Sequence, residues 1–208
     1  MKKILPLLTL PLLLATSCEQ AQKAREGYNN LEKLSKAGEQ MEANMEASKT
    51  RRAEREQHGD TLALSYKDLQ NYLPANVSGY AAQEPSGQSM KVSGMSFSTA
   101  ERKFTKDADE VEVKLVDYNG ANQLFQGASM MFSLGLESED SESRVQSVSF
   151  KQEGVKGMET LHKNSGETEL VMAVGDRFIV TITGTHQKDF ALVEDIAQRM
   201  DLAKLTKL

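Results

Sequence analysis

The spacing of apolar residues along the chain predicts both strands and helices. Apolar and polar residues alternate over 111–115 and again over 170–174, and a period of two is typical of half-buried strands. Gly175 and Asp176 follow the second run, and the alternation resumes over 178–182. We interpret this stretch as a β-hairpin with a two-residue loop.

A helical period is found in three places. Ser65 can cap a short helix that ends before Pro74, and a final helix is predicted over residues 187–203. A middle helix is predicted between Asn119, as its cap, and Gly135, as its end. It rests on apolar residues at helical spacing, which are Ala121, Leu124, Phe125, Ala128, Met131 and Phe132.

Weaker patterns predict the other strands. Pro85–Gly87 and Asn164–Gly166 are expected to be turns, and Gly94 a bulge or a bend. The predicted order is therefore helix, three strands, helix, four strands, helix. The weaker strands are 79–84, 90–104, 144–150 and 155–162.

This order predicts an α+β fold. Hairpin-connected strands form antiparallel sheets, and amphipathic helices need a sheet face to cover. We expect an antiparallel sheet flanked by two or three helices and preceded by a long polar N-terminal helix. The element order of residues 60–205 resembles the PsbP-like α+β sandwich, in which helices flank a central antiparallel sheet. This resemblance carries over no functional residue.

The N-terminus has the pattern of a secretory signal. Lys2 and Lys3 precede an apolar stretch, Ile4–Ala15, which is too short for a membrane-spanning helix. The sequence Ala15-Thr16-Ser17-Cys18 follows, with Leu14 before it, and resembles the lipobox of bacterial lipoproteins. The resemblance implies cleavage after residue 17 and acylation of Cys18 with chains such as palmitate. An ordinary cleaved signal with an incidental cysteine is the alternative.

Residues 19–58 are expected to form a polar helical tether. They contain no proline, and eight acidic residues balance eight basic ones. A thin apolar stripe includes Leu34, Met41 and Met45, but Gly38 interrupts it, so a spacer helix is favoured over a self-associating coiled coil or disorder. Met41 and Met45 alone are too few soft ligands for a copper site. The predicted division is a signal peptide (1–17), a lipid-anchored tether (18–59) and a globular domain (60–208).

Composition and charge narrow the function classes. The chain has 208 residues, of which 39% are hydrophobic, and one cysteine. A single cysteine excludes an intrachain disulfide and a four-cysteine zinc site. The net charge is −5 and becomes −7 when Lys2 and Lys3 are removed with the signal, which argues against nucleic acid as a partner.

Candidate chemistry is sparse. His58, His162 and His186 lack a metal-binding spacing. No serine-nucleophile, phosphate-loop or dinucleotide motif is present in the sequence. The acidic runs at 137–142 and 107–110 contain hard oxygen ligands for calcium but lack EF-hand spacing, so we interpret both as solvated loops. The sequence predicts no catalytic residue, no cofactor and no metal site.

These observations favour a lipid-anchored bacterial envelope protein that acts as a non-catalytic binding or assembly module. Its partners would be the bilayer, through acylated Cys18, and an envelope protein or small ligand. Weak self-association through residues 19–58 is a further expectation. We expect the outer rather than the inner membrane, with the domain in the periplasm or at the cell surface. Residues 121–132 are the expected contact region, with Gln123 and Gln126 at its exposed surface, although the same stripe can simply face the sheet. An envelope hydrolase with an unrecognised site is the alternative.

Overall fold

The structure, a computed structural model, describes residues 35, 38–39, 42–43, 45–129, 132 and 135–208. The chain divides into two units, residues 1–45 and residues 46–208. The described residues of the first unit are helical, and helix continues to residue 57. The predicted helix over 19–58 therefore lies mostly outside the described residues. The second unit contains the whole sheet.

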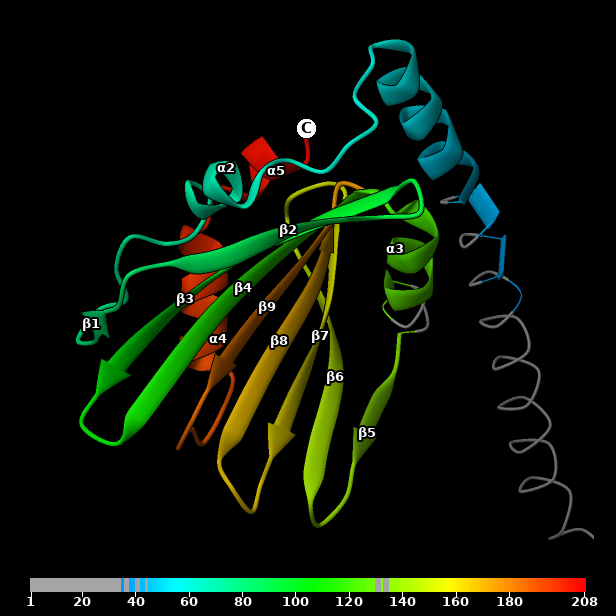
Figure 1. The fold of residues 1–208 in the computed structure, drawn as a ribbon. Helices are drawn as coiled ribbons and strands as arrows, with labels where there is room; N and C mark the ends of the chain where they lie inside the picture. The colour runs from blue at the N-terminus through cyan, green and yellow to red at the C-terminus, as the bar shows by residue number, and fades with distance from the viewer. Residues whose placement is uncertain (1–34, 36–37, 40–41, 44, 130–131, 133–134) are drawn as a thin grey trace, which may run out of the picture. The chain divides into compact units, whose positions relative to one another are not determined.

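The second unit is built on one antiparallel sheet of nine strands with few helices, which confirms the coarse fold prediction (Figure 1). The strand order is β1-β3-β4-β9-β8-β7-β6-β5, and β2 pairs with the same edge of β3 as β1 does. The strands are β1 (Ala81–Ala82), β2 (Ser86–Val92), β3 (Met95–Lys106), β4 (Asp109–Gly120), β5 (Glu137–Glu139), β6 (Ser143–Ser149), β7 (Val155–His162), β8 (Glu167–Val174) and β9 (Phe178–Gly184). The helices are α2 (Tyr66–Gln70), α3 (Asn122–Ser129), α4 (Ala191–Arg199) and α5 (Leu202–Leu205).

The two faces of the sheet have different covers. One face, here called the core face, packs against α2, α4 and α5, and α4 lies behind the sheet in the view of Figure 1. The other, here called the α3 face, packs against α3. The predicted alternation is confirmed in β4 and β8, because every second residue of these strands is fully buried on the core face. The buried residues of these two strands include Val111, Val113, Leu115, Leu170, Met172 and Val174.

Two features predicted around β2 differ from the structure. Pro85–Gly87 is not a turn, because Ser86 already begins β2 and Gly87 lies opposite Ala100. A Cβ atom on Gly87 would lie 2.5 Å from the main-chain oxygen of Thr99, so this glycine permits close packing rather than a turn. Gly94 is not a bulge within one strand. Together with Ser93, at φ values of 82° and 51°, it forms the hairpin turn between β2 and β3.

The loop between β8 and β9 has three residues, Gly175–Arg177, because Val174 lies opposite Phe178. The predicted two-residue loop is therefore wrong by one residue. Gly175 does adopt the positive φ expected of it, 61°. The extra residue, Arg177, is 2% exposed, which places a charged side chain inside the unit.

The helices also need corrections. Ser65 caps α2 as predicted, since its side chain accepts from the main-chain N–H of Asp68. Asn119 does not cap the middle helix, because β4 continues to Gly120, which pairs with Ser96. The predicted final helix is interrupted at Met200, whose backbone is extended at ψ 142°. A second helix, α5, follows, with Asp201 as its N-cap.

The strand count differs from the prediction as well. Four strands precede α3 and five follow it, instead of three and four. The additional strands are β2 and β5. The predicted strand 90–104 corresponds to parts of both β2 and β3, and β5 lies in the acidic run that the sequence predicts to be a loop. Of the predicted strand 79–84, only Ala81–Ala82 pairs. Polar, fully exposed strands lack the apolar period on which the sequence prediction depends.

Candidate functional site

The predicted contact helix contributes mainly to the packing of the sheet. Phe125 and Phe132 are 4% and 8% exposed, and they pack against Ile179, Tyr118 and Met158 on the α3 face. Ala121, Phe125 and Phe132 of the predicted stripe are therefore buried, as expected if the stripe faces the sheet, whereas Leu124 and Ala128 are exposed. On the outer side of α3, Leu124 is 49% exposed and Gln123 and Gln126 are exposed.

An exposed apolar surface lies beside α3, on the hairpin of β2 and β3. Met90, Val92 and Met95, here called the hairpin patch, are 40%, 51% and 44% exposed. Met90 lies opposite Phe97, and Val92 lies opposite Met95. Opposite residues of an antiparallel pair share a face, as do alternate residues of one strand. All three side chains therefore lie on one face, together with Phe97.

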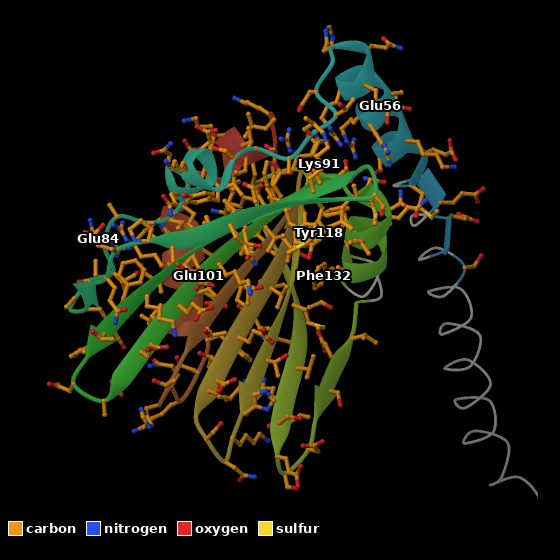
Figure 2. The ribbon with its side chains drawn as sticks, viewed as in Figure 1. Glu56, Glu84, Lys91, Glu101, Tyr118 and Phe132 are labelled. Atoms are coloured by element: carbon orange, nitrogen blue, oxygen red, sulfur yellow. The ribbon has the colours of Figure 1, made fainter. Side chains whose placement is uncertain are left out.

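The hairpin patch is continuous with the buried cluster under α3. Phe97 stacks on Tyr118, with ring centroids 6.4 Å apart, and Tyr118 packs against the cluster that contains Phe132. Figure 2 labels both Tyr118 and Phe132 on this face. Exposed apolar side chains that adjoin a packed cluster are typical of contact surfaces, and methionine adapts its shape to different partners. The sequence prediction missed this patch, because it took Met90–Phe104 for one strand.

The structure does not bring the histidines together. His58, His162 and His186 are exposed, and Nδ1 of His186 lies 2.9 Å from a carboxylate oxygen of Asp109. Within the described part of the chain, no group of three or more His, Cys, Asp or Glu residues is placed to hold a metal ion. Cys18 and Met41 lie outside the described residues, and Met45 is 46% exposed.

The acidic residues at 137–142 are used locally. The carboxylate of Asp140 accepts from the main-chain N–H groups of Ser143 and Glu142 at 2.7 and 2.8 Å, and these bonds lower its pKa. Lys163 donates to Glu139 at 2.8 Å and lowers the pKa of that carboxyl group. These contacts stabilise a turn and a short strand. In the other acidic run, Glu110 is bonded to Lys103 at 2.9 Å.

A buried arginine cluster lies where the N-terminal segment, the loop of β8 and β9 and the end of the chain meet. Arg177 donates to both carboxylate oxygens of Asp117 at 2.9 and 2.8 Å. It also donates to Asp60 at 2.8 Å and to the main-chain oxygen of Leu208 at 3.0 Å. Asp117 is fully buried. Because these partners occupy its donors, the buried guanidinium links three segments of the chain and is not available to bind a ligand.

The same cluster holds the helical residues that precede the domain. Arg55 donates to the side-chain oxygen of Asn119 at 3.1 Å, and Asn119 donates to Asp60 at 2.8 Å. Arg51 forms an ion pair with Asp176. Burial, and then the neighbouring charge of Arg177, lower the pKa of Arg55. Residues 51–60 are thus bonded to the sheet at several points.

A buried carboxyl pair lies between β7 and α4. Glu159 is fully buried on the core face, and its Oε2 accepts from Gln146 at 2.9 Å. Its Oε1 has no hydrogen-bond partner. Burial, followed by the negative charge of Glu194 on α4, raises the pKa of Glu159 to about 7, against the opposing effects of Gln146 and Arg144.

With a pKa of about 7, Glu159 is partly protonated near neutral pH. General acids in enzymes are often carboxyl groups with a raised pKa. Among the described residues, Glu159 is the only carboxyl group whose pKa is raised. However, Glu159 has no exposed surface, so a substrate could not touch it without a rearrangement of the core face. The sequence prediction passed over Glu159 and Arg177, although both lie within predicted hairpin strands or their loops.

The chain matches no family model, no curated protein and no solved structure. Among the described residues, no helix has the length and apolar character needed to cross a membrane.

Proposed function

We propose that the protein is a lipoprotein of the bacterial envelope that binds another envelope component without catalysing a reaction. The signal-like residues 1–17 and the single cysteine, Cys18, support an acyl anchor. Two or three acyl chains suffice for stable anchoring, whereas one does not. An outer-membrane location, with the domain in the periplasm or at the cell surface, belongs to the same proposal, as does a likeness to the PsbP-like sandwich at the level of element order.

The observation that carries the binding role is the hairpin patch. Three large apolar side chains are about half exposed on one face, next to a packed cluster that supports them from behind. Leaving such side chains in water forgoes the free energy of burial, so their exposure is best explained by a partner that covers them. An anchor that raises the local concentration of the domain near membrane partners makes a modest contact surface sufficient.

The contacts of residues 51–60 support the role of a spacer. Arg51 and Arg55 bond to Asp176 and Asn119, so the segment reaches the domain in a fixed direction. A spacer that is bonded to its domain limits the orientations in which the hairpin patch can meet a partner.

Site-specific photocrosslinking in living cells tests this proposal. A photoreactive amino acid at Met95, in the full-length chain, should give one discrete adduct. The same amino acid at Lys188, which is exposed in the loop before α4, should give none. Cys18→Ser should move the protein from the membrane fraction and abolish the Met95 adduct. Equal labelling at Met95 and Lys188 would refute the proposal. It would also be refuted if the Cys18→Ser variant stayed in the membrane fraction and the wild-type protein carried no acyl mass.

The alternative is an envelope hydrolase, and the carboxyl pair is the observation that favours it. A panel of ester, peptide and glycoside substrates, assayed with wild type and Glu159→Gln, separates the two functions. Turnover that is lost in Glu159→Gln while the fold is retained would establish the enzyme. We expect no turnover, because the side chain of Glu159 is fully buried.

A further inference from the structure

The sheet ends in two different edges. At one edge lies β5, which has three residues, two of them glutamates. At the other lies β2, which has seven residues, all exposed, and pairs only with β3 among the described strands. The outer side of β2, here called the free edge, therefore presents unpaired main-chain donors and acceptors. Proteins commonly block such edges with short strands, charges or proline, and β2 contains a single charged residue, Lys91.

The free edge carries opposite charges at its two ends. Glu84 precedes β2, and Glu101 of β3 lies beside its first residue, where it accepts from the hydroxyl of Ser86 at 3.0 Å. Lys91 lies near its last residue. Figure 2 shows Glu84 and Lys91 toward opposite ends of the strand. Lys114 lies opposite Glu101 on β4, on the side away from the free edge. Residues 86–90 between the ends are uncharged.

The core-face side of β2 is held in position. The main-chain N–H of Tyr66, in α2, donates to the hydroxyl of Ser89 at 2.9 Å, and Ser98 donates to the same hydroxyl at 2.8 Å. Gly87 packs against Thr99 and Tyr66 with no room for a side chain. The strand is therefore ordered before any partner arrives, which lowers the entropic cost of pairing.

We propose that the free edge pairs with the free edge of a second copy of this chain, in antiparallel orientation. Antiparallel pairing of two copies brings the acidic end of each β2 to the basic end of the other, so the favourable contact occurs twice across a twofold axis. Parallel pairing would bring like charges together. The product is a continuous sheet through both copies, with both α3 faces, and both hairpin patches, on the same side.

Charge-reversal variants of the full mature chain test this pairing. All carry Cys18→Ser, so that acyl chains cannot drive association, and association is measured by sedimentation over a concentration series. Lys91→Glu makes both ends of β2 acidic, and Glu84→Lys with Glu101→Gln makes both ends basic. Each variant alone should dimerise roughly tenfold more weakly than the parent chain. An equimolar mixture of the two should recover the parent affinity, because unlike ends meet again.

Two controls keep the result specific. Lys188→Glu makes the same change of net charge away from β2 and should leave dimerisation unchanged. Met95→Gln alters the hairpin patch without adding a charge at the basic end of β2, and it should also leave dimerisation unchanged. The two proposals can therefore fail separately. A parent chain that stays monomeric, a dimer that Lys91→Glu does not weaken, or a mixture that fails to recover would overturn the pairing. A misfolded variant cannot imitate recovery in the mixture.

Discussion

The core face and the α3 face of the sheet differ in how much apolar surface they bury. On the core face, three helices cover a continuous layer of fully buried side chains from β4, β7, β8 and β9. On the α3 face, one helix of eight residues contributes Phe125, and Phe132 follows it. Burial of apolar area is the main favourable term in folding. Most of the buried apolar residues therefore lie on the core face, and the α3 face can expose apolar residues at little cost in stability.

The largest effect is expected at the buried ion pair of the core face. Asp117→Ala leaves Arg177 buried with fewer partners, and breaking one side of such a pair costs about 3–5 kcal/mol. Urea unfolding measures the loss. Replacing both residues, by Asp117→Leu with Arg177→Met, should cost less than the single change. A loss below about 1 kcal/mol for Asp117→Ala would show that the arginine cluster is not an essential part of the core face.

The matching test on the α3 face is Phe125→Ala. It should cost about 2–4 kcal/mol, because a large side chain is removed from a cluster that only one helix encloses. Hydrogen exchange should show faster exchange in α3 while β8 and β9 stay protected. If the central strands lose protection as well, the two faces are not separable in stability.

The carboxyl pair predicts a dependence of stability on pH. The pKa of Glu159 is about 7 in the folded state and has an ordinary value of 4.5, so the folded state binds the proton more tightly than the unfolded state does. The free energy of unfolding should therefore fall as pH rises from 4.5 through 7. Glu159→Gln, which mimics the protonated acid, should remove this fall and stabilise the protein by up to about 3 kcal/mol at pH 8.

Exposed Glu153 provides the control for this measurement. Glu153→Gln should leave the pH dependence unchanged. Chemical denaturation at pH 5 and pH 8 is sufficient for the comparison. If Glu159→Gln is no more stable than wild type at pH 8, the pKa of Glu159 is not raised in the folded state.

The smallest effect is expected at the hairpin that closes the core face. Gly175 has a φ of 61°, and a Cβ atom there would lie 3.0 Å from the Cα atom of Thr206. Gly175→Val should therefore destabilise the protein by roughly 1–3 kcal/mol. Gly94→Val is the comparison, because Gly94 has a similar φ and nothing within 4 Å of its Cβ position. A smaller loss at Gly175 than at Gly94 would mean that Thr206 yields easily.

The strands of the core face were predictable because their residues alternate. Val111, Val113 and Leu115 define a period that Asp117 continues, and Val155, Gly157 and Leu161 define one in which Glu159 falls. Asp117 thus continues the apolar phase of a predicted strand, which is a signal that could have found it. Glu159 was harder to find, because the strand predicted over 155–162 rests on Val155, Met158 and Leu161, and Met158 lies on the other face. The partner of Asp117 could not be found, because Arg177 is separated from it by 60 positions.

The polar strands were not predictable from periodicity. In β2, Ser-Gly-Gln-Ser-Met-Lys-Val, every residue is exposed, so no alternation of apolar and polar residues identifies the strand. Its glycine is also typical of turns. The free edge, and the hairpin patch that adjoins it, exist only because β3 pairs with β2 along part of its length. Tertiary pairing overrides local propensity at such positions.

The bond between Asp60 and Arg177 also sets where a mechanical load enters the molecule. Arg177 lies in the loop that joins β8 to β9, and these two strands lie in the middle of the sheet order. A pull transmitted through residues 46–60 is therefore applied to the centre of the sheet, where strands are bonded on both sides, and not to an edge that could be peeled away.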